Sequence, residues 1–323
     1  MRYPRHKIRG KGCYYHLVNH VSGPRHALPF MEEDKEMGFQ IAKKLQKLYC
    51  IDIISLCWMN NHFHMIVYCP GNKPPLNDVV ERYNSFYKHD VYGHPPLNAT
   101  AQPKRCNKVA EKLIDISEFM RSFQQRFTNW FNKKNSRQGP LWKSRFWSCI
   151  LEGSIALWEC VKYVELNPVR AGLVDDPGNY EYGTWGRFRK KRNQPFYKSF
   201  IKHLKKNLNR RRSKFRKEGI QLSVLELFEL EIKTAMLIEG RLLGEEKKKL
   251  LESVNVQEKM NFNRFLIRVY NWTSGMIIGS SRFVENTAKL FYQSEYIKKK
   301  KKGYGKNSLG DFLVCFHRGQ VFS

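Results

Sequence analysis

Acidic residues are scarce in this chain of 323 residues. It carries 29 Asp and Glu against 58 Lys and Arg, which gives a formal net charge of +29 at pH 7. A field this positive suits a polyanionic partner, with nucleic acid first and an acidic membrane surface second. At this length the chain can bury a sizeable core and is expected to hold one full domain and a smaller one.

Long hydrophobic runs and paired cysteines are also missing. No apolar run reaches transmembrane length, and residues 1–7 lack the apolar core of a signal peptide. We therefore expect no membrane partner, which leaves nucleic acid as the favoured one. The eight cysteines form no Cys-x-x-Cys pair, so a zinc finger is not expected. They lie mostly in apolar stretches, as buried thiols of a reducing compartment do, so we expect a cytoplasmic, nucleoid-associated protein.

Hydrophobic periodicity predicts strands alternating with helices over the first half of the chain. Ser117 is expected to cap one helix and Pro168 to help end another. A proline-rich loop is predicted over 70–103, with one short helix near 78–87, and loops of this length are often functional. The expected strands are 13–21, 51–59, 62–68 and 141–151, and the expected helices are 32–49, 117–134 and 154–167.

A basic run separates this half from the rest. Arg187–Lys217 holds 15 Lys and Arg and no Asp or Glu, so it should bind phosphate backbones in a salt-dependent way or act as a solvated linker. We predict a domain at 1–185, a basic linker at 186–217 and a mainly helical accessory domain at 218–323. A glycine-containing turn before a predicted helix at 282–292 admits a DNA-binding helix-turn-helix, but no base-reading surface is identifiable.

Two histidines stand at the start of the third predicted strand. Side chains alternate between the faces of a strand, so His62 and His64 are expected on one face and Phe63 in the core. Two neighbouring imidazoles can hold a divalent metal when a third ligand comes from elsewhere. The alternative interpretation is a pair of partly exposed strand histidines with no ligand.

A tyrosine and an asparagine share one face of the last predicted helix of this half. Tyr163 and Asn167 are four residues apart, so a phenol hydroxyl and an amide oxygen lie on adjacent turns. The alternative is a tyrosine that packs at the core edge and an asparagine that caps the helix.

Together these residues suggest phosphoryl transfer. His62, His64 and Asn167 are candidate ligands for Mg²⁺ or Mn²⁺, which would neutralise phosphate oxygens. Tyr163 is the candidate nucleophile, because a side-chain hydroxyl can form a covalent intermediate. No spaced carboxylate cluster of the two-metal nuclease kind stands out, which favours a one-metal tyrosine mechanism.

These residues also resemble a known family. Asn61–His64, followed by an apolar run, resembles the HUH motif of single-strand endonucleases. Phe131–Asn132, Gly139–Phe146 and Tyr163–Val174 are similar, in order, to recurrent blocks of REP-associated tyrosine transposases. The similarity covers roughly residues 1–185, and the ordered set of blocks is far more specific than the two histidines alone.

The resemblance implies an α+β fold with a ferredoxin-like antiparallel sheet, helices packed on it, and a mainly helical C-terminal region after it. It implies His62, His64 and Asn167 as metal ligands and Tyr163 as the residue that forms a 5′-phosphotyrosine. The implied activity is that of a metal-dependent single-strand DNA endonuclease and transposase on hairpin-forming DNA. Relatives differ in whether one chain or two complete the site, so a monomer and a homodimer are both open.

Two alternatives and two departures accompany this interpretation. A protein of the same fold could bind hairpin DNA or RNA without cutting it, and an unrelated RNA-binding protein could use its aromatic residues for base stacking. Phe127 stands where members often have tyrosine, and the 70–103 loop is longer than expected. Four cations are candidate DNA contacts, although each could equally be a surface charge: Arg126, Lys143, Arg145 and Arg170.

Overall fold

The structure is a computed structural model of the whole chain. It describes most of the first 206 residues and several separate segments after them. The described residues are 5–23, 29–88, 93–153, 155–191, 194–206, 223–242, 244–253, 272, 275–293, 301–306 and 312–317.

Four antiparallel strands from the first half of the chain form one part of a single sheet. Strand β3 (His62–Cys69) lies between β2 (Asp52–Trp58) and β1 (Cys13–His20), and β1 pairs on its other side with β4 (Trp147–Leu151). The predicted strands are confirmed at 13–20, 52–58 and 62–69. The fourth is shorter than predicted, because residues 141–146 are not part of the ladder.

The C-terminal region continues this sheet instead of forming a purely helical domain. Strand β5 (Gly275–Ser280) pairs parallel to β4, and β7 (Phe312–His317) and β6 (Lys301–Lys306) follow in antiparallel pairing. The seven strands have the order β2-β3-β1-β4-β5-β7-β6. The expectation of a wholly antiparallel sheet is therefore wrong, since one pairing is parallel, and the C-terminal region contributes three described strands in addition to its helices. Overall the fold is mixed α/β.

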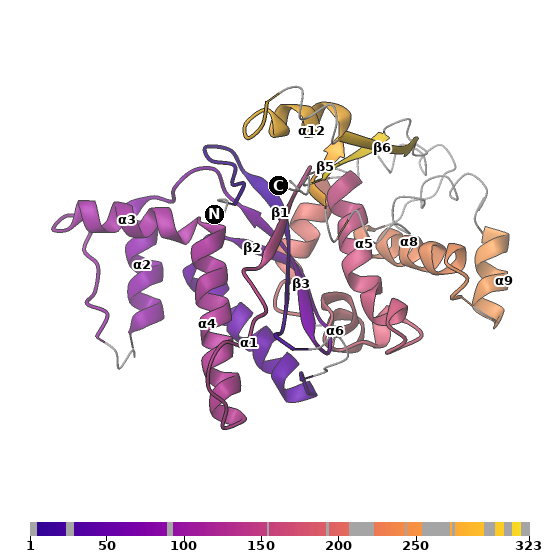
Figure 1. The fold of residues 1–323 in the computed structure, drawn as a ribbon, viewed down its shortest axis with the longest axis horizontal. Coiled ribbons are helices and arrows are strands. Elements are labelled where there is room, and N and C mark those ends of the chain that lie inside the picture. Colours follow the sequence, from indigo (N-terminus) through magenta and orange to yellow (C-terminus); the bar gives the residue numbers. More distant parts are fainter. Residues whose placement is uncertain are drawn as a thin grey trace.

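Helices cover both faces of the sheet (Figure 1). On one face lie α1 (Glu32–Leu48) and α4 (Ile116–Lys134), whose apolar residues share a core with Phe63. Two further helices, α2 (Leu76–Tyr87) and α3 (Pro103–Leu113), lie beside them. The short helix predicted in the proline-rich loop is thus confirmed as α2, whereas α3 was not predicted.

The other face carries the helix of the candidate tyrosine. Helix α5 (Ile155–Arg170) shares a core with Ile66 of β3 and with α8 (Val224–Ile238). A 3₁₀ turn (Pro177–Asn179) and α6 (Thr184–Lys191) follow α5. His62 and His64 lie on this face of β3 and Phe63 on the opposite one, as the alternation predicted.

Two helix ends differ from their predictions for local reasons. Helix α4 is capped by Asp115, not by Ser117, because the Asp115 carboxylate accepts hydrogen bonds from the N–H groups of Ser117 and Glu118. Helix α5 continues through Pro168 to Arg170. Proline has no N–H to donate to the carbonyl of Val164, and the side-chain amide of Asn167 donates to that oxygen at 3.3 Å.

Part of the predicted linker is helical and buried. Residues 197–206 are helical, and Phe200 and Leu204 lie in the core that contains α5. This part is therefore not a solvated linker, while residues 207–222 lie outside the described residues. The division into 1–185 and 218–323 stays a prediction.

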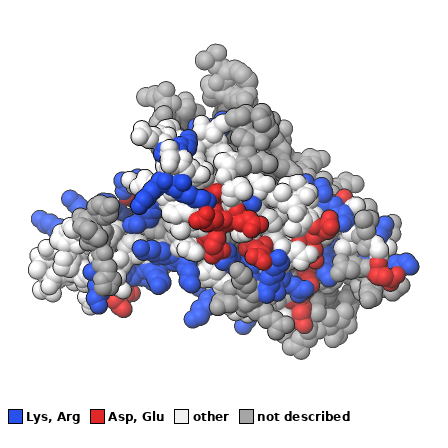
Figure 2. Space-filling view, turned by 90° about the horizontal axis from the view of Figure 1, so that it is seen from below, with Lys and Arg blue, Asp and Glu red and all other residues white. Residues whose placement is uncertain are grey.

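The remaining C-terminal helices are short. Helix α9 (Gly244–Ser253) follows α8, and α12 (Ser281–Ala288) packs on β5 and β7, ending earlier than the predicted helix at 282–292. Within the described ranges, no helix is long and apolar enough to cross a membrane. On the face seen in Figure 2, acidic side chains gather near the middle and Lys and Arg side chains lie on either side.

Candidate functional site

Four histidines lie in a row on the face of the sheet that α5 covers. Antiparallel pairing of β1 and β3 sets His20 opposite His62, and their rings stack with centroids 4.5 Å apart. The ring of His62 contacts that of His64 edge-on, with centroids 5.0 Å apart, and the ring of His64 stacks on that of His16, with centroids 5.2 Å apart. The Nδ1 atom of His64 lies 3.0 Å from the Nε2 atom of His16, within hydrogen-bond distance.

The row runs from the surface into the interior. His20 is exposed and His62 half-buried, while His64 and His16 are buried. Burial, with a smaller effect of His20, lowers the pKa of His62 to about 3, and burial lowers the pKa of His64 well below its usual value. The inner imidazoles are therefore neutral at physiological pH, which is the form that binds metals or accepts protons.

Tyr163 covers the inner end of this row. Its ring meets those of His64 and His16 edge-on, with centroids 5.7 and 6.0 Å away. Trp272 stacks on the Tyr163 ring with centroids 5.5 Å apart, and the guanidinium of Arg170 lies 5.2 Å from the centroid of the same ring. Tyr163 is only 1% exposed, and burial raises the pKa of its hydroxyl.

Asn167 lies on the next turn of α5 and is held by that helix. Its side-chain nitrogen donates to the carbonyl oxygens of Tyr163 at 2.9 Å and Val164 at 3.3 Å. The structure thus brings Tyr163 into ring contact with His64, which in turn contacts His62, and places Asn167 on the next turn of α5.

The four predicted DNA contacts are scattered. Lys143 is exposed beside the outer end of the histidine row, and its backbone N–H donates to the carbonyl of His20 at 2.9 Å. Arg145 is exposed two residues further on. Helix α4 places Arg126 on the opposite side of the sheet, where its guanidinium lies 5.4 Å from the ring centroid of Phe86.

Arg170 lies at the site but is bound to the protein. Its guanidinium forms a two-pronged ion pair with the carboxylate of Glu239 at 2.6 and 3.2 Å, and it also donates to the carbonyl of Tyr163. Both charged side chains are nearly buried. The pair joins the end of α5 to the end of α8.

Comparisons with known proteins add little to this geometry. No protein-family model and no curated protein matches the chain. A solved structure of a REP-associated tyrosine transposase bound to a REP hairpin is distantly similar. It has 16% sequence identity and a TM-score of 0.38, and the match covers 58% of this chain and 84% of that one. A likeness this weak carries no argument about function, which has to rest on the residues themselves.

The donor atoms present fit a divalent metal in type. The Nδ1 atom of His62 lies 2.6 Å from the side-chain oxygen of Asn61, which orients the ring and leaves Nε2 with its lone pair. Two neutral imidazoles and one amide oxygen suit Mn²⁺ better than Mg²⁺, which prefers oxygen. Within the part of the chain that the structure describes, no group of three or more His, Cys, Asp and Glu side chains is arranged to hold a metal.

Sequence reasoning missed half of the histidine row. His16 and His20 are four residues apart on a strand that was predicted correctly, so their common face was readable from the alternation. Their partnership with His62 and His64 was not, because it depends on which strands pair. Trp272 was also missed, since nothing in the sequence links it to Tyr163.

Proposed function

We propose that the chain is a metal-dependent single-strand DNA endonuclease and strand transferase that acts on hairpin-forming DNA through a 5′-phosphotyrosine. The observation that carries the proposal is the contact of Tyr163 with the inner histidines, with Asn167 one turn away. The ring of a candidate nucleophile thus contacts neutral imidazoles, and a side-chain amide lies on the adjacent turn of the same helix. The excess of basic residues supplies affinity for the polyanionic substrate.

The proposed chemistry assigns each residue a role. His62, His64 and Asn167 would hold Mn²⁺ or Mg²⁺, which neutralises phosphate oxygens when bound. The Tyr163 oxygen forms a bond to phosphorus and gives up its proton, while the bond from phosphorus to the 3′ oxygen breaks and that oxygen leaves as a 3′-hydroxyl.

We also propose that residues 13–170 form a ferredoxin-like unit. Along the chain, β1, α1, β2, β3, α4 and β4 alternate in the order of two βαβ halves, with α2 and α3 inserted between β3 and α4. Their four strands are all antiparallel, in the order β2-β3-β1-β4. The three C-terminal strands then extend this unit at its β4 edge.

The burial of Tyr163 favours a second candidate function. With Trp272 stacked on its ring, a DNA phosphate cannot reach the hydroxyl in this conformation, and the raised pKa makes the hydroxyl a weaker nucleophile. A protein that binds hairpin DNA or RNA without cutting it would have no need to uncover Tyr163. Strand transfer requires a rearrangement that exposes the Tyr163 hydroxyl.

A denaturing gel assay for a covalent adduct separates the two functions. The whole protein would be mixed with labelled single-stranded hairpin DNA and Mn²⁺ or Mg²⁺. The first candidate predicts a metal-dependent adduct that resists denaturation, that disappears in Tyr163→Phe and that is strongly reduced in His64→Ala.

The matched control is Tyr197→Phe, which removes the hydroxyl of an exposed tyrosine outside the site. It should form the adduct at the wild-type level. Salt-sensitive binding with no adduct on any hairpin, including hairpins from the source genome, would contradict strand transfer and support the non-cutting binder.

A further inference from the structure

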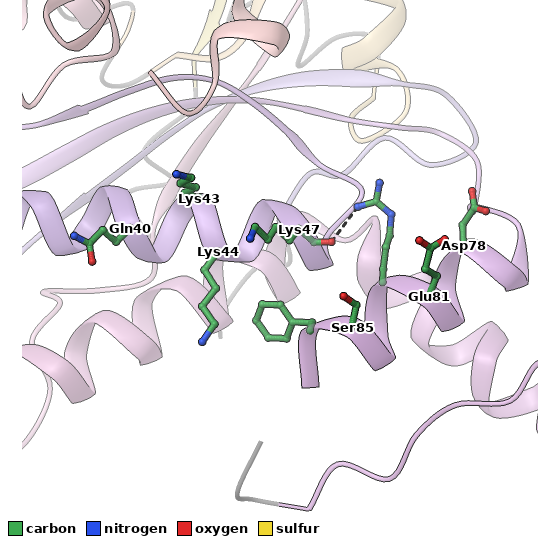
Figure 3. Close-up of a pocket in the computed structure, with 9 residues that line it drawn as sticks. Gln40, Lys43, Lys44, Lys47, Asp78, Glu81 and Ser85 are labelled. Atoms are coloured by element: carbon green, nitrogen blue, oxygen red, sulfur yellow. Dashed lines mark hydrogen bonds between the residues drawn. The ribbon is translucent and has the colours of Figure 1, made fainter. Parts of the chain in front are cut away.

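A groove of about 830 Å³ lies between α1 and α2, away from the tyrosine (Figure 3). Helix α1 packs with α4 on the face of the sheet opposite to the histidine row, so the groove and the candidate site face different ways. Helix α2 belongs to the segment between β3 and α4 that is longer than expected. The groove is therefore formed by α1 together with a helix of this segment, and it is separate from the candidate site.

Three lysines line the α1 side of this groove. Lys43, Lys44 and Lys47 are all exposed, and Figure 3 shows them along one helix that faces α2. Among the ion pairs of the described residues, none involves these three side chains. From Gly38 to Leu48, α1 carries no acidic residue. Repulsion among uncompensated lysines on adjacent turns is relieved by an anion bound between them.

An aromatic ring lies among these charges. Phe86 of α2 is half-buried and lines the groove. The ammonium of Lys44 lies 5.7 Å from its ring centroid, and the guanidinium of Arg126 from α4 lies 5.4 Å from it. Alternation of cations with an aromatic face is the arrangement by which proteins hold single-stranded nucleic acid, with phosphates on the cations and a base on the ring.

The acidic lining residues occupy the other end. Figure 3 shows Asp78 and Glu81 beyond Lys47, toward the start of α2, while Lys43, Lys44 and Ser85 lie nearer the end of that helix. Arg82 is tied to this acidic end and donates to the backbone carbonyl of Lys47 at 3.2 Å. A phosphate is therefore attracted to the half of the groove that contains Lys43 and Lys44 and repelled from the other half.

We propose that this groove is a second binding site for single-stranded nucleic acid, with phosphates on Lys43, Lys44 and Lys47 and a base against Phe86. The proposal rests on the proposed function only in taking nucleic acid as the polyanion. An acidic peptide would also suit the lysines, but it would leave the Phe86 ring without a flat partner. A strand in the groove lies on the opposite side of the sheet from Tyr163, so it holds DNA outside the cleavage position.

Binding without chemistry tests the proposal. A Tyr163→Phe protein in the presence of a chelator would be titrated into a labelled single strand of about 20 nucleotides, long enough to fill one groove. Adding Lys43→Gln, Lys44→Gln and Lys47→Gln should weaken binding about tenfold at roughly 100 mM salt. The slope of log K against log salt should become shallower by about 2, since each lost phosphate contact on a single strand removes about 0.7.

The matched control removes the same charge from α3. Lys104, Lys108 and Lys112 are exposed lysines on one side of that helix, and changing all three to Gln should weaken binding less than about threefold. Phe86→Leu should weaken binding about fivefold and leave the salt slope unchanged, because it removes stacking and no charge.

Two results would overturn the groove. One is wild-type affinity for the strand in the α1 triple variant. The other is an equal loss of affinity in the α1 and α3 triple variants, which would mean that binding depends on the net charge of the protein and not on this groove. A third pair of results would assign the site to a protein partner instead. In that case an acidic peptide displaces the strand from the wild-type protein but not from the α1 triple variant, and the Phe86→Leu variant binds the strand with wild-type affinity. Since no step needs Tyr163, the outcome is independent of the adduct assay.

Discussion

Tyr163 and Trp272 stack face to face, with ring centroids 5.5 Å apart and planes 22° from parallel. Tyr163 comes from α5, and Trp272 from the C-terminal region that extends the sheet. Both side chains are buried, so the C-terminal region closes the candidate site in this conformation.

Trp272→Ala is expected to uncover Tyr163. Losing a buried indole costs about 3–5 kcal/mol of unfolding free energy, and Trp272→Phe, which keeps a ring in place, should cost less. Nitration of the folded protein followed by peptide mass spectrometry should find Tyr163 modified in the alanine variant and protected in the wild type. Adduct formation should rise in the same order. Equal protection in both variants would show that Trp272 does not shield the tyrosine.

Arg170 is expected to act in stability and not as a DNA contact. Its ion pair with Glu239 is nearly buried, and removing one partner leaves an uncompensated charge. Arg170→Gln and Glu239→Gln should each lower the unfolding free energy by about 3 kcal/mol in urea titrations. The double variant should lose clearly less than the sum. Affinity for DNA should stay within about twofold of the wild type in a salt-matched titration. A loss of DNA affinity in Arg170→Gln but not in Glu239→Gln would show instead that Arg170 contacts DNA.

Glu165 should make stability depend on pH. Burial raises its pKa to about 7, against the hydrogen bonds it accepts from Ser55 and the N–H of Trp185. The folded state therefore binds this proton more tightly than the unfolded state does. The contribution is fully present below about pH 4.5 and is lost as pH rises through 7, by about 3 kcal/mol.

Comparison with Glu165→Gln isolates this effect from the buried histidines, which titrate in both proteins. Urea unfolding at several pH values between about 4.5 and 8 should show that the unfolding free energy of the variant, relative to that of the wild type, increases as pH rises. A constant difference across this range would mean that the carboxyl stays charged in the folded protein.

Mn²⁺ should stabilise the folded protein through the histidine row. At a concentration about ten times its dissociation constant, a metal that binds only the folded state adds about 1.4 kcal/mol. Thermal unfolding should show this increase in the wild type, with reversal by a chelator, and should not show it in His62→Ala. His94→Ala, which removes an exposed histidine outside the row, is the matched control. Stabilisation that persists in His62→Ala would place the metal elsewhere.

The local elements of the first half were predictable because their signals are local. An apolar run after an Asn-Asn turn identified β3, and helical spacing identified α1 and α4. The helix ends were less accurate, since Asp115 rather than Ser117 caps α4 and α5 runs through Pro168. At Pro168 the side chain of Asn167 supplies the hydrogen-bond donor that proline lacks. A rule that considers proline alone does not predict this.

The C-terminal strands were not predictable in the same way. Gly275–Ser280 is too short and too rich in glycine to show a period, and it becomes a strand because the edge of β4 offers unpaired backbone groups. That pairing is long-range, so it converts a segment expected to be part of a helical domain into a continuation of the first sheet.

By itself, the sequence determined the residue types of the site and the face on which each lies. His62 and His64 share a face because strand side chains alternate, and Tyr163 and Asn167 are adjacent because a helix turns every 3.6 residues. Only the tertiary structure decided that His16 and His20 join the row, that Trp272 closes it, and that Arg170 is held by Glu239. These contacts join residues 42 to 109 positions apart, and such pairs are chosen by strand pairing and core packing, which have no period along the chain.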